Sequence, residues 1–226
     1  MKRCYLRILA VALLAPVFAS PALAQKYEVY PYAGGEFWGG FRAHEDQLEK
    51  FSLTNPALFG VRGGFMATTN LQIEGNVSYA TQFRIRNTFD NNFFNPSIHA
   101  WQYEGGLLYN FSKAKLVPYL ALGAGALVQH ISNPDNILDP KEVTYNIIVP
   151  EFFNGGPIPF TTRQITMRDN NAFFTFSYGG GIKGQRLWGP LGFRVDLRGR
   201  TVPNFYSETI NAFEPTGGLL FTWGEP

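Results

Sequence analysis

Residues 71–79 read Leu71-Gln72-Ile73-Glu74-Gly75-Asn76-Val77-Ser78-Tyr79, with apolar residues or glycine at odd positions and polar residues at even positions. A period of two is the pattern of a β-strand whose two faces meet different surroundings, whereas a helix repeats every 3.6 residues. This stretch therefore predicts a strand with one apolar and one polar face.

The same alternation recurs in segments of about 10 residues, the length that a tilted strand needs to cross a membrane. After residue 24, no segment keeps apolar residues at helical spacing for three turns. We expect strands at residues 29–41, 59–65, 71–79, 101–111, 116–129, 174–183, 191–200 and 217–223. Eight is an even number, as closure of an up-and-down barrel requires. The expected fold is all-β: an eight-stranded antiparallel up-and-down transmembrane β-barrel.

The connections between these strands alternate in length. Three are short, at residues 68–70, 112–115 and 185–190, and four are long, at residues 42–56, 83–100, 130–171 and 201–212. Outer-membrane barrels have short periplasmic turns and long external loops. The alternation therefore predicts that the long connections lie outside the cell.

A soluble, lipocalin-like barrel is the alternative, because it also has eight strands but an apolar interior. Periodicity alone does not decide which face is inside. The apolar face carries Tyr79, Tyr103, Tyr109 and Phe111 near strand ends, as expected of aromatic girdles at a membrane surface. This favours a lipid-facing apolar stripe and a charged lumen. The expected lumen charge cluster, whose simplest role is to stabilise the fold, comprises Glu36, Arg62, Glu74, Glu104, Arg194, Asp196 and Arg198.

The first residues have the features of an export signal. Lys2, Arg3 and Arg7 precede the apolar stretch 8–18, and Ala22-Leu23-Ala24 supplies small residues for cleavage. The apolar stretch is shorter than the roughly 20 residues that span a bilayer, which disfavours an uncleaved anchor. We predict a signal peptide at 1–24, a barrel domain at 25–226, and localisation to the outer membrane of a Gram-negative-type cell.

Composition excludes several other classes of protein. Without residues 1–24 the chain carries 16 Lys and Arg against 17 Asp and Glu, so nothing indicates nucleic-acid binding. Its only cysteine, Cys4, lies in the leader, which excludes disulfides and thiolate metal sites from the mature chain. Charged residues make up 16%, compared with about 25% in typical soluble domains. We expect no cofactor and no metal.

The last strand ends in Thr216-Gly217-Gly218-Leu219-Leu220-Phe221-Thr222-Trp223. Gly218, Phe221 and Trp223 resemble the assembly signal of bacterial outer-membrane barrels, although Gly224-Glu225-Pro226 follows the aromatic residue that is usually last. The runs 117–125, 178–182 and 193–198 also resemble strands of the outer-membrane protein β-barrel domain family, which includes the barrel of outer-membrane protein A.

The resemblance covers nearly all of the mature chain, but its motifs are loose. It implies a structural, surface-interaction or narrow, porin-like pore role without catalysis, and lumen ion pairs such as Glu74 and Glu104 with Arg194 and Arg198. The implied partners are outer-membrane lipid and lipopolysaccharide, the barrel-assembly machinery and periplasmic chaperones. We expect a monomer.

One motif predicts chemistry instead. His130-Ile131-Ser132-Asn133 is similar to the His-any-Ser-Asn stretch of lipid A deacylases, in which the His is the base and the Ser the nucleophile. In that family the stretch lies on the penultimate strand, whereas here it follows the fifth. Glu142 and Glu151 lie in the long connection, so neither is a fixed partner for His130. A deacylase-like hydrolase using His130 and Ser132 is therefore the alternative function.

The long connection has two further readings. Its residues Tyr145–Val149, Phe152, Phe153 and Phe160 are apolar, which predicts either a binding element or a hairpin above the membrane with its turn at Asn154–Pro157. Asp135, Asn136 and Asp139 lack the spacing of an EF-hand calcium loop. His44-Glu45-Asp46 has no second His at metal-ligand spacing.

Overall fold

The structure is a computed structural model that describes residues 26–39, 41–42, 50–87, 97–132, 142–150, 160–205 and 208–224. The predicted signal peptide, the segment 44–46, Asp135, Asn136, Asp139 and the predicted hairpin turn at 154–157 lie outside these residues. Within the described ranges, no helix is long and apolar enough to cross a membrane.

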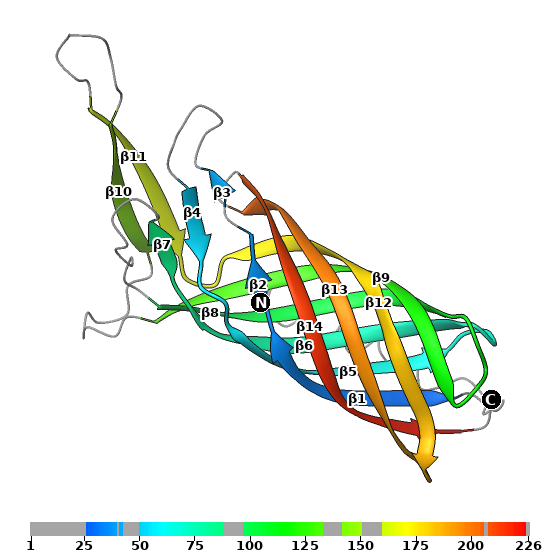
Figure 1. Cartoon of the computed structure of the whole chain (residues 1–226). Coiled ribbons are helices and arrows are strands. Elements are labelled where there is room, and N and C mark those ends of the chain that lie inside the picture. The colour runs from blue at the N-terminus through cyan, green and yellow to red at the C-terminus, as the bar shows by residue number, and fades with distance from the viewer. Residues whose placement is uncertain are drawn as a thin grey trace, which may run out of the picture.

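Eight antiparallel strands of the described chain form a closed barrel (Figure 1). They are β1 (Tyr27–Gly35), β5 (Ala57–Met66), β6 (Leu71–Phe83), β8 (Ser97–Asn110), β9 (Leu116–Ser132), β12 (Ala172–Trp188), β13 (Leu191–Phe205) and β14 (Glu208–Trp223). Each strand pairs with the next, and β1 pairs with β14 to close the ring. The predicted eight-stranded antiparallel barrel is confirmed.

Alternation along each strand separates the two faces. In β6, the even-numbered residues from Gln72 to Ala80 are buried, while Ile73 and Val77 are exposed on the outside. Leu122 and Phe174, on neighbouring strands, are 58% and 59% exposed. Exposed side chains of this kind form a continuous apolar surface around a polar interior, which is the arrangement of a transmembrane barrel.

The turns at one end are short. They span residues 67–70, 111–115 and 189–190, and the chain's last described residue, Gly224, lies at the same end (Figure 1). In the orientation typical of outer-membrane barrels this end faces the periplasm.

At the opposite end, short strands project beyond the barrel (Figure 1). β10 (Glu142–Pro150) pairs with β11 (Phe160–Arg168), which confirms the hairpin predicted in the long connection. A second small sheet has the order β3 (Phe41–Arg42), β4 (Lys50–Leu53) and β7 (Ile85–Asn87). The external side therefore contains the predicted hairpin and, in β4 and β7, strands that the sequence did not predict.

Strand limits differ from the prediction in several places; β12, for example, continues to Trp188, through part of the predicted turn 185–190. The last two barrel strands extend through most of the predicted loop 201–212, because Val202 pairs with Ile210 and Phe205 with Glu208. The fifth barrel strand extends to Ser132, because β9 stays paired with β8 up to Ser97. In both cases the backbone pairing continues toward the external end of the barrel. Alternation of side chains shows which face a residue occupies, but not where the lipid-facing part of a strand ends.

The first predicted strand, 29–41, is interrupted. β1 ends at Gly35, and β2 (Phe37–Trp38) resumes the pairing with β14 after Glu36. The backbone N–H of Glu36 donates to the carbonyl of Pro56 instead of a ladder partner. Glu36 is buried like the other even-numbered residues Glu28, Tyr30, Tyr32 and Trp38, so the alternation continues through the break.

Candidate functional site: the charged lumen

Among the described residues, the barrel interior holds eleven buried charged side chains of both signs. The cations are Arg62, Lys183, Arg194, Arg198 and Arg200, and the anions are Glu28, Glu36, Glu74, Glu104, Asp196 and Glu214. Each occupies an inward-facing position of the side-chain alternation. The structure thus brings all seven residues of the predicted lumen cluster into one interior.

The outer layer of this network is built around Arg200 of β13. Its guanidinium lies 2.7 Å from Glu36, 3.1 Å from Glu104 and 2.8 Å from Glu214. Gln102 donates a hydrogen bond to the Glu36 carboxylate at 2.9 Å. One cation therefore holds three carboxylates from three other segments of the wall.

The middle layer joins opposite walls. Glu74 of β6 lies 2.5 Å from Arg194 and 2.6 Å from Arg198, both on β13. These two strands are four steps apart in an eight-membered ring, so the ion pairs cross the axis of the barrel. Arg62 pairs with Asp196 at 2.9 Å and with Glu214 at 2.7 Å.

Tyrosine rings fill the space between these cations. The guanidinium of Arg62 lies 4.2 Å from the centroid of Tyr32, and that of Arg194 lies 4.8 Å from Tyr30 and 4.7 Å from Tyr119. The Tyr119 hydroxyl donates to Asp196 and accepts from Arg194. Stacking of this kind supplies desolvated arginines with further electrostatic contacts.

A third layer closes the periplasmic end. Lys183 Nζ lies 2.7 Å from Glu28 and donates to Gln72 at 2.8 Å. Gln185 donates to the other oxygen of Glu28 at 3.1 Å. The carboxylate of Glu28 thus has both oxygens paired.

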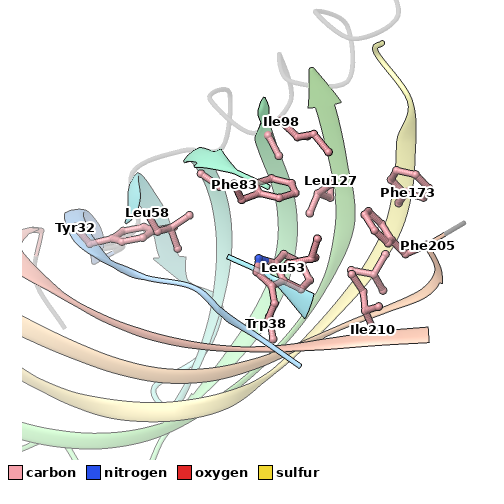
Figure 2. Close-up of a cluster of buried hydrophobic side chains, with 14 of the residues drawn as sticks. Tyr32, Trp38, Leu53, Leu58, Phe83, Ile98, Leu127, Phe173, Phe205 and Ile210 are labelled. Carbon is pink, nitrogen blue, oxygen red and sulfur yellow. The ribbon is translucent and has the colours of Figure 1, made fainter. Parts of the chain in front are cut away.

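Above the ionic layers the interior becomes apolar. Figure 2 shows this apolar plug, whose members come from several strands and include Trp38, Leu53, Phe83, Ile98, Leu127, Phe173, Val202, Phe205 and Ile210. The rings of Trp38 and Phe83 lie 6.4 Å apart, and those of Phe173 and Phe205 lie 4.9 Å apart. Trp38 and Leu53 come from β2 and β4, so segments outside the barrel proper help to fill its outer mouth.

Sequence analysis left four charged residues out of the cluster. Arg200 and Lys183 occupy polar stripes of predicted strands, and extending the cluster along those stripes would have found them. Glu28 and Glu214 fall just before the predicted starts of the first and last strands. The apolar plug had no sequence signal, because bulges between Ala80 and Phe83 and between Val202 and Phe205 shift the side-chain alternation.

The predicted assembly residues lie on β14, which closes the ring. Gly218 faces inward against β1, where a side chain would collide with the Pro31 carbonyl. The rings of Phe221 and Trp223 stack at 6.0 Å, and Trp223 is half-exposed. Their role as an assembly signal remains a prediction.

The hydrolase motif has a geometry that the sequence did not indicate. His130 pairs with His99 across β8 and β9, with their rings stacked at 5.4 Å. Its Nδ1 atom lies 3.7 Å from Asp169, whose carboxylate also accepts the backbone N–H of Ile131 at 3.0 Å. Asp169 thus places a carboxylate beside His130. Within the described residues, no group of three or more His, Cys, Asp or Glu is arranged to hold a metal ion.

Comparison with known families gives a clear result. The family model of the outer membrane protein beta-barrel domain matches residues 10–210. The chain belongs to this family. It is accordingly an outer-membrane protein of a Gram-negative cell, as its sequence predicts.

Solved structures agree with the fold. Outer membrane protein OprG from Pseudomonas aeruginosa superposes with a TM-score of 0.54 at 10% identity, covering 89% of this chain and 97% of that one. Neisserial surface protein A superposes with a TM-score of 0.51 at 10% identity, covering 87% and 96%. No curated protein sequence matches the chain significantly. At these identities the likeness shows the shared barrel alone.

The central cation of the outer layer provides a test of the network. Replacing Arg200 with Met keeps much of the volume but leaves Glu36, Glu104 and Glu214 short of a cation. Removing one partner of a buried ion pair costs about 3–5 kcal/mol. We expect the free energy of unfolding, measured by urea titration of the barrel in lipid vesicles, to fall by that amount. Leu197→Met, on the outward face of the same strand, is the control and should change stability by less than about 1.5 kcal/mol. An equal effect of both variants would contradict the assigned role.

Proposed function

We propose that this protein is a non-catalytic outer-membrane barrel with a closed lumen, acting as a structural element and through its external strands. The observation that carries the proposal is the set of ion pairs between Glu74 and the two arginines of the opposite wall. An eight-stranded barrel has an interior just wide enough for side chains to fill. Charges that meet at its axis leave no continuous path for water.

Two different sets of side chains fill the lumen, one above the other. The ionic layers occupy the periplasmic half and centre, and the apolar plug around Phe83, Phe173 and Phe205 occupies the outer mouth. Opening a pore would require both to move. Moving the ionic part would leave buried charges without partners, which is unfavourable by several kcal/mol per charge.

The external strands are the remaining place for a specific role. A rigid barrel that carries extended connections on one side suits recognition, because binding residues concentrate on such connections. β10 and β11 form a hairpin well outside the barrel, and β3, β4 and β7 form a second sheet beside it. We propose these strands as the contact surface for lipopolysaccharide or another cell's surface. We further propose that the barrel-assembly machinery inserts the protein and recognises Gly218, Phe221 and Trp223. The protein is then a monomer.

Conductance across planar bilayers tests the closed lumen. Purified, folded protein should give no stable channel openings at a concentration where an open porin inserts readily. Insertion is checked separately by heat-modifiable gel mobility of protein recovered from the same lipid. Regular, long-lived openings from the folded protein would rule out the closed lumen and support the porin-like alternative.

A second candidate function rests on the contact of His130 with Asp169. A carboxylate beside a histidine orients the ring and stabilises its protonated form. Ser132 is two residues further along the same strand, so His130 as base and Ser132 as nucleophile remain the alternative, with an ester of lipid A as substrate.

Mass spectra of lipid A decide between the two candidates. Under the closed, non-catalytic proposal, cells that express the protein keep the same lipid A acyl chains as cells that do not. Loss of an acyl chain that depends on both His130 and Ser132, and disappears in Ser132→Ala, would establish the hydrolase instead. Ser112→Ala, in a periplasmic turn, serves as the control substitution.

A further inference from the structure

The periplasmic end of the barrel carries four cations, of which only Lys26 also contacts the lumen network, through Glu28 at 3.6 Å. We call Lys26, Lys113, Lys115 and Arg186 the basic rim. Lys113, Lys115 and Arg186 are exposed, and Lys26 is half-buried. Among the described residues of this end, at 26, 67–70, 111–115, 185–190 and 224, none is acidic. Glu28 is buried inside the barrel and paired with Lys183.

Hydrogen bonds of Gln185 link three of the chain segments that carry these cations. The Lys26 ammonium donates to the Gln185 side chain. The backbone N–H of Gln185 donates to the carbonyl of Lys115 at 2.7 Å. Arg186 follows directly in the chain. Three segments of the barrel thus bring like charges together at one edge.

This arrangement has an electrostatic cost. Partial burial lowers the pKa of Lys26, the neighbouring Glu28 opposes that shift, and the charge of Arg186 adds to it. Like charges that stay together without an exposed counter-charge favour binding of an anion, since a ligand would relieve their repulsion.

Backbone geometry at Arg186 supports a specific placement of its side chain. Arg186 has a φ of 49°, a left-handed conformation that non-glycine residues rarely adopt. It lies within the bulge between Gly184 and Trp188, where the β12–β13 register shifts. Bulges re-aim side chains at sheet edges. The guanidinium of Arg186 also donates to the carbonyl of Gly224, which fixes it at the rim.

Apolar residues beside the cations indicate where the rim lies relative to the bilayer. Phe111 and Leu116 flank the two lysines of one turn, and Leu187 and Trp188 follow Arg186; Trp188 is 69% exposed. Tryptophan concentrates at the membrane–water interface. Cations interleaved with such residues therefore lie at the depth of lipid headgroups rather than free in the periplasm.

We propose that the basic rim binds the phosphate of an anionic phospholipid in the periplasmic leaflet. The cations contact the headgroup, while Leu187 and Trp188 lie along its acyl chains. A soluble periplasmic polyanion would match the charges but would leave these exposed apolar side chains without a role. An anionic lipid would contact both the cations and the exposed apolar side chains.

Native mass spectrometry of the detergent-purified full-length mature protein tests this proposal. The probes are phosphatidylglycerol and phosphatidylcholine with identical acyl chains, so that only the headgroup charge differs. The variant Lys113→Gln/Lys115→Gln/Arg186→Gln removes three charges, and Lys113→Arg/Lys115→Arg/Arg186→Lys, which keeps all three charges at the same positions, is the matched control. The double variant Lys113→Gln/Lys115→Gln retains the hydrogen bond of Arg186 to Gly224, in case the triple variant does not fold.

The wild type and the control should prefer phosphatidylglycerol, and the rim triple variant should lose at least about tenfold of that preference, because each cation near an anionic lipid surface contributes about fivefold. The double variant should lose part of it. Equal binding of the two lipids by the wild type, or an unchanged preference in both rim variants, would overturn the proposal. Retention of soluble polyglutamate but not of phosphatidylglycerol would overturn it in favour of an acidic protein partner.

Discussion

A charge buried away from water needs an opposite charge close by, and this requirement organises the whole interior of the barrel. Three groups of side chains meet this requirement: Arg200 with its three carboxylates, Glu74 with its two arginines, and Lys183 with Glu28. Glu74 and its two arginines come from opposite walls, so satisfying these charges places paired side chains across the axis. Stability of the barrel and the closure of the lumen that we propose therefore have one physical origin.

The same requirement accounts for two local features. At Glu36, between β1 and β2, the even-numbered alternation places a carboxylate against Arg200. Tyr30, Tyr32 and Tyr119 line the cations with rings rather than with aliphatic side chains, so that the arginines keep favourable contacts on the faces that no carboxylate reaches. The apolar plug then separates the ionic interior from the external solution.

Much of this arrangement could be predicted from the sequence, because period-two alternation assigns each residue of a regular strand to one face. Residues such as Glu74, Asp196 and Arg198 lie within long alternating runs and were predicted to face the lumen. Glu28 and Glu214 were missed because alternation does not mark where a strand begins. Trp38 lies on the same face as Glu36, as the alternation of the first predicted strand implies. Leu53 was missed because it belongs to a separate short strand, and Phe205 because a bulge puts it inside. Asp169 was missed because its contact with His130 depends on how the long connection re-enters the barrel.

Residues 25–226 contain no cysteine, so a single thiol introduced there reports directly on access to the lumen. Ser177 is buried in the wall beside Glu104 and Arg198. In folded Ser177→Cys, a charged thiosulfonate reagent should fail to react until the protein is unfolded, while Thr69→Cys in an exposed turn reacts at once. Labelling of Ser177→Cys in the folded barrel at the rate of Thr69→Cys would show that water and ions pass through the interior, and would contradict the closed, ion-paired lumen.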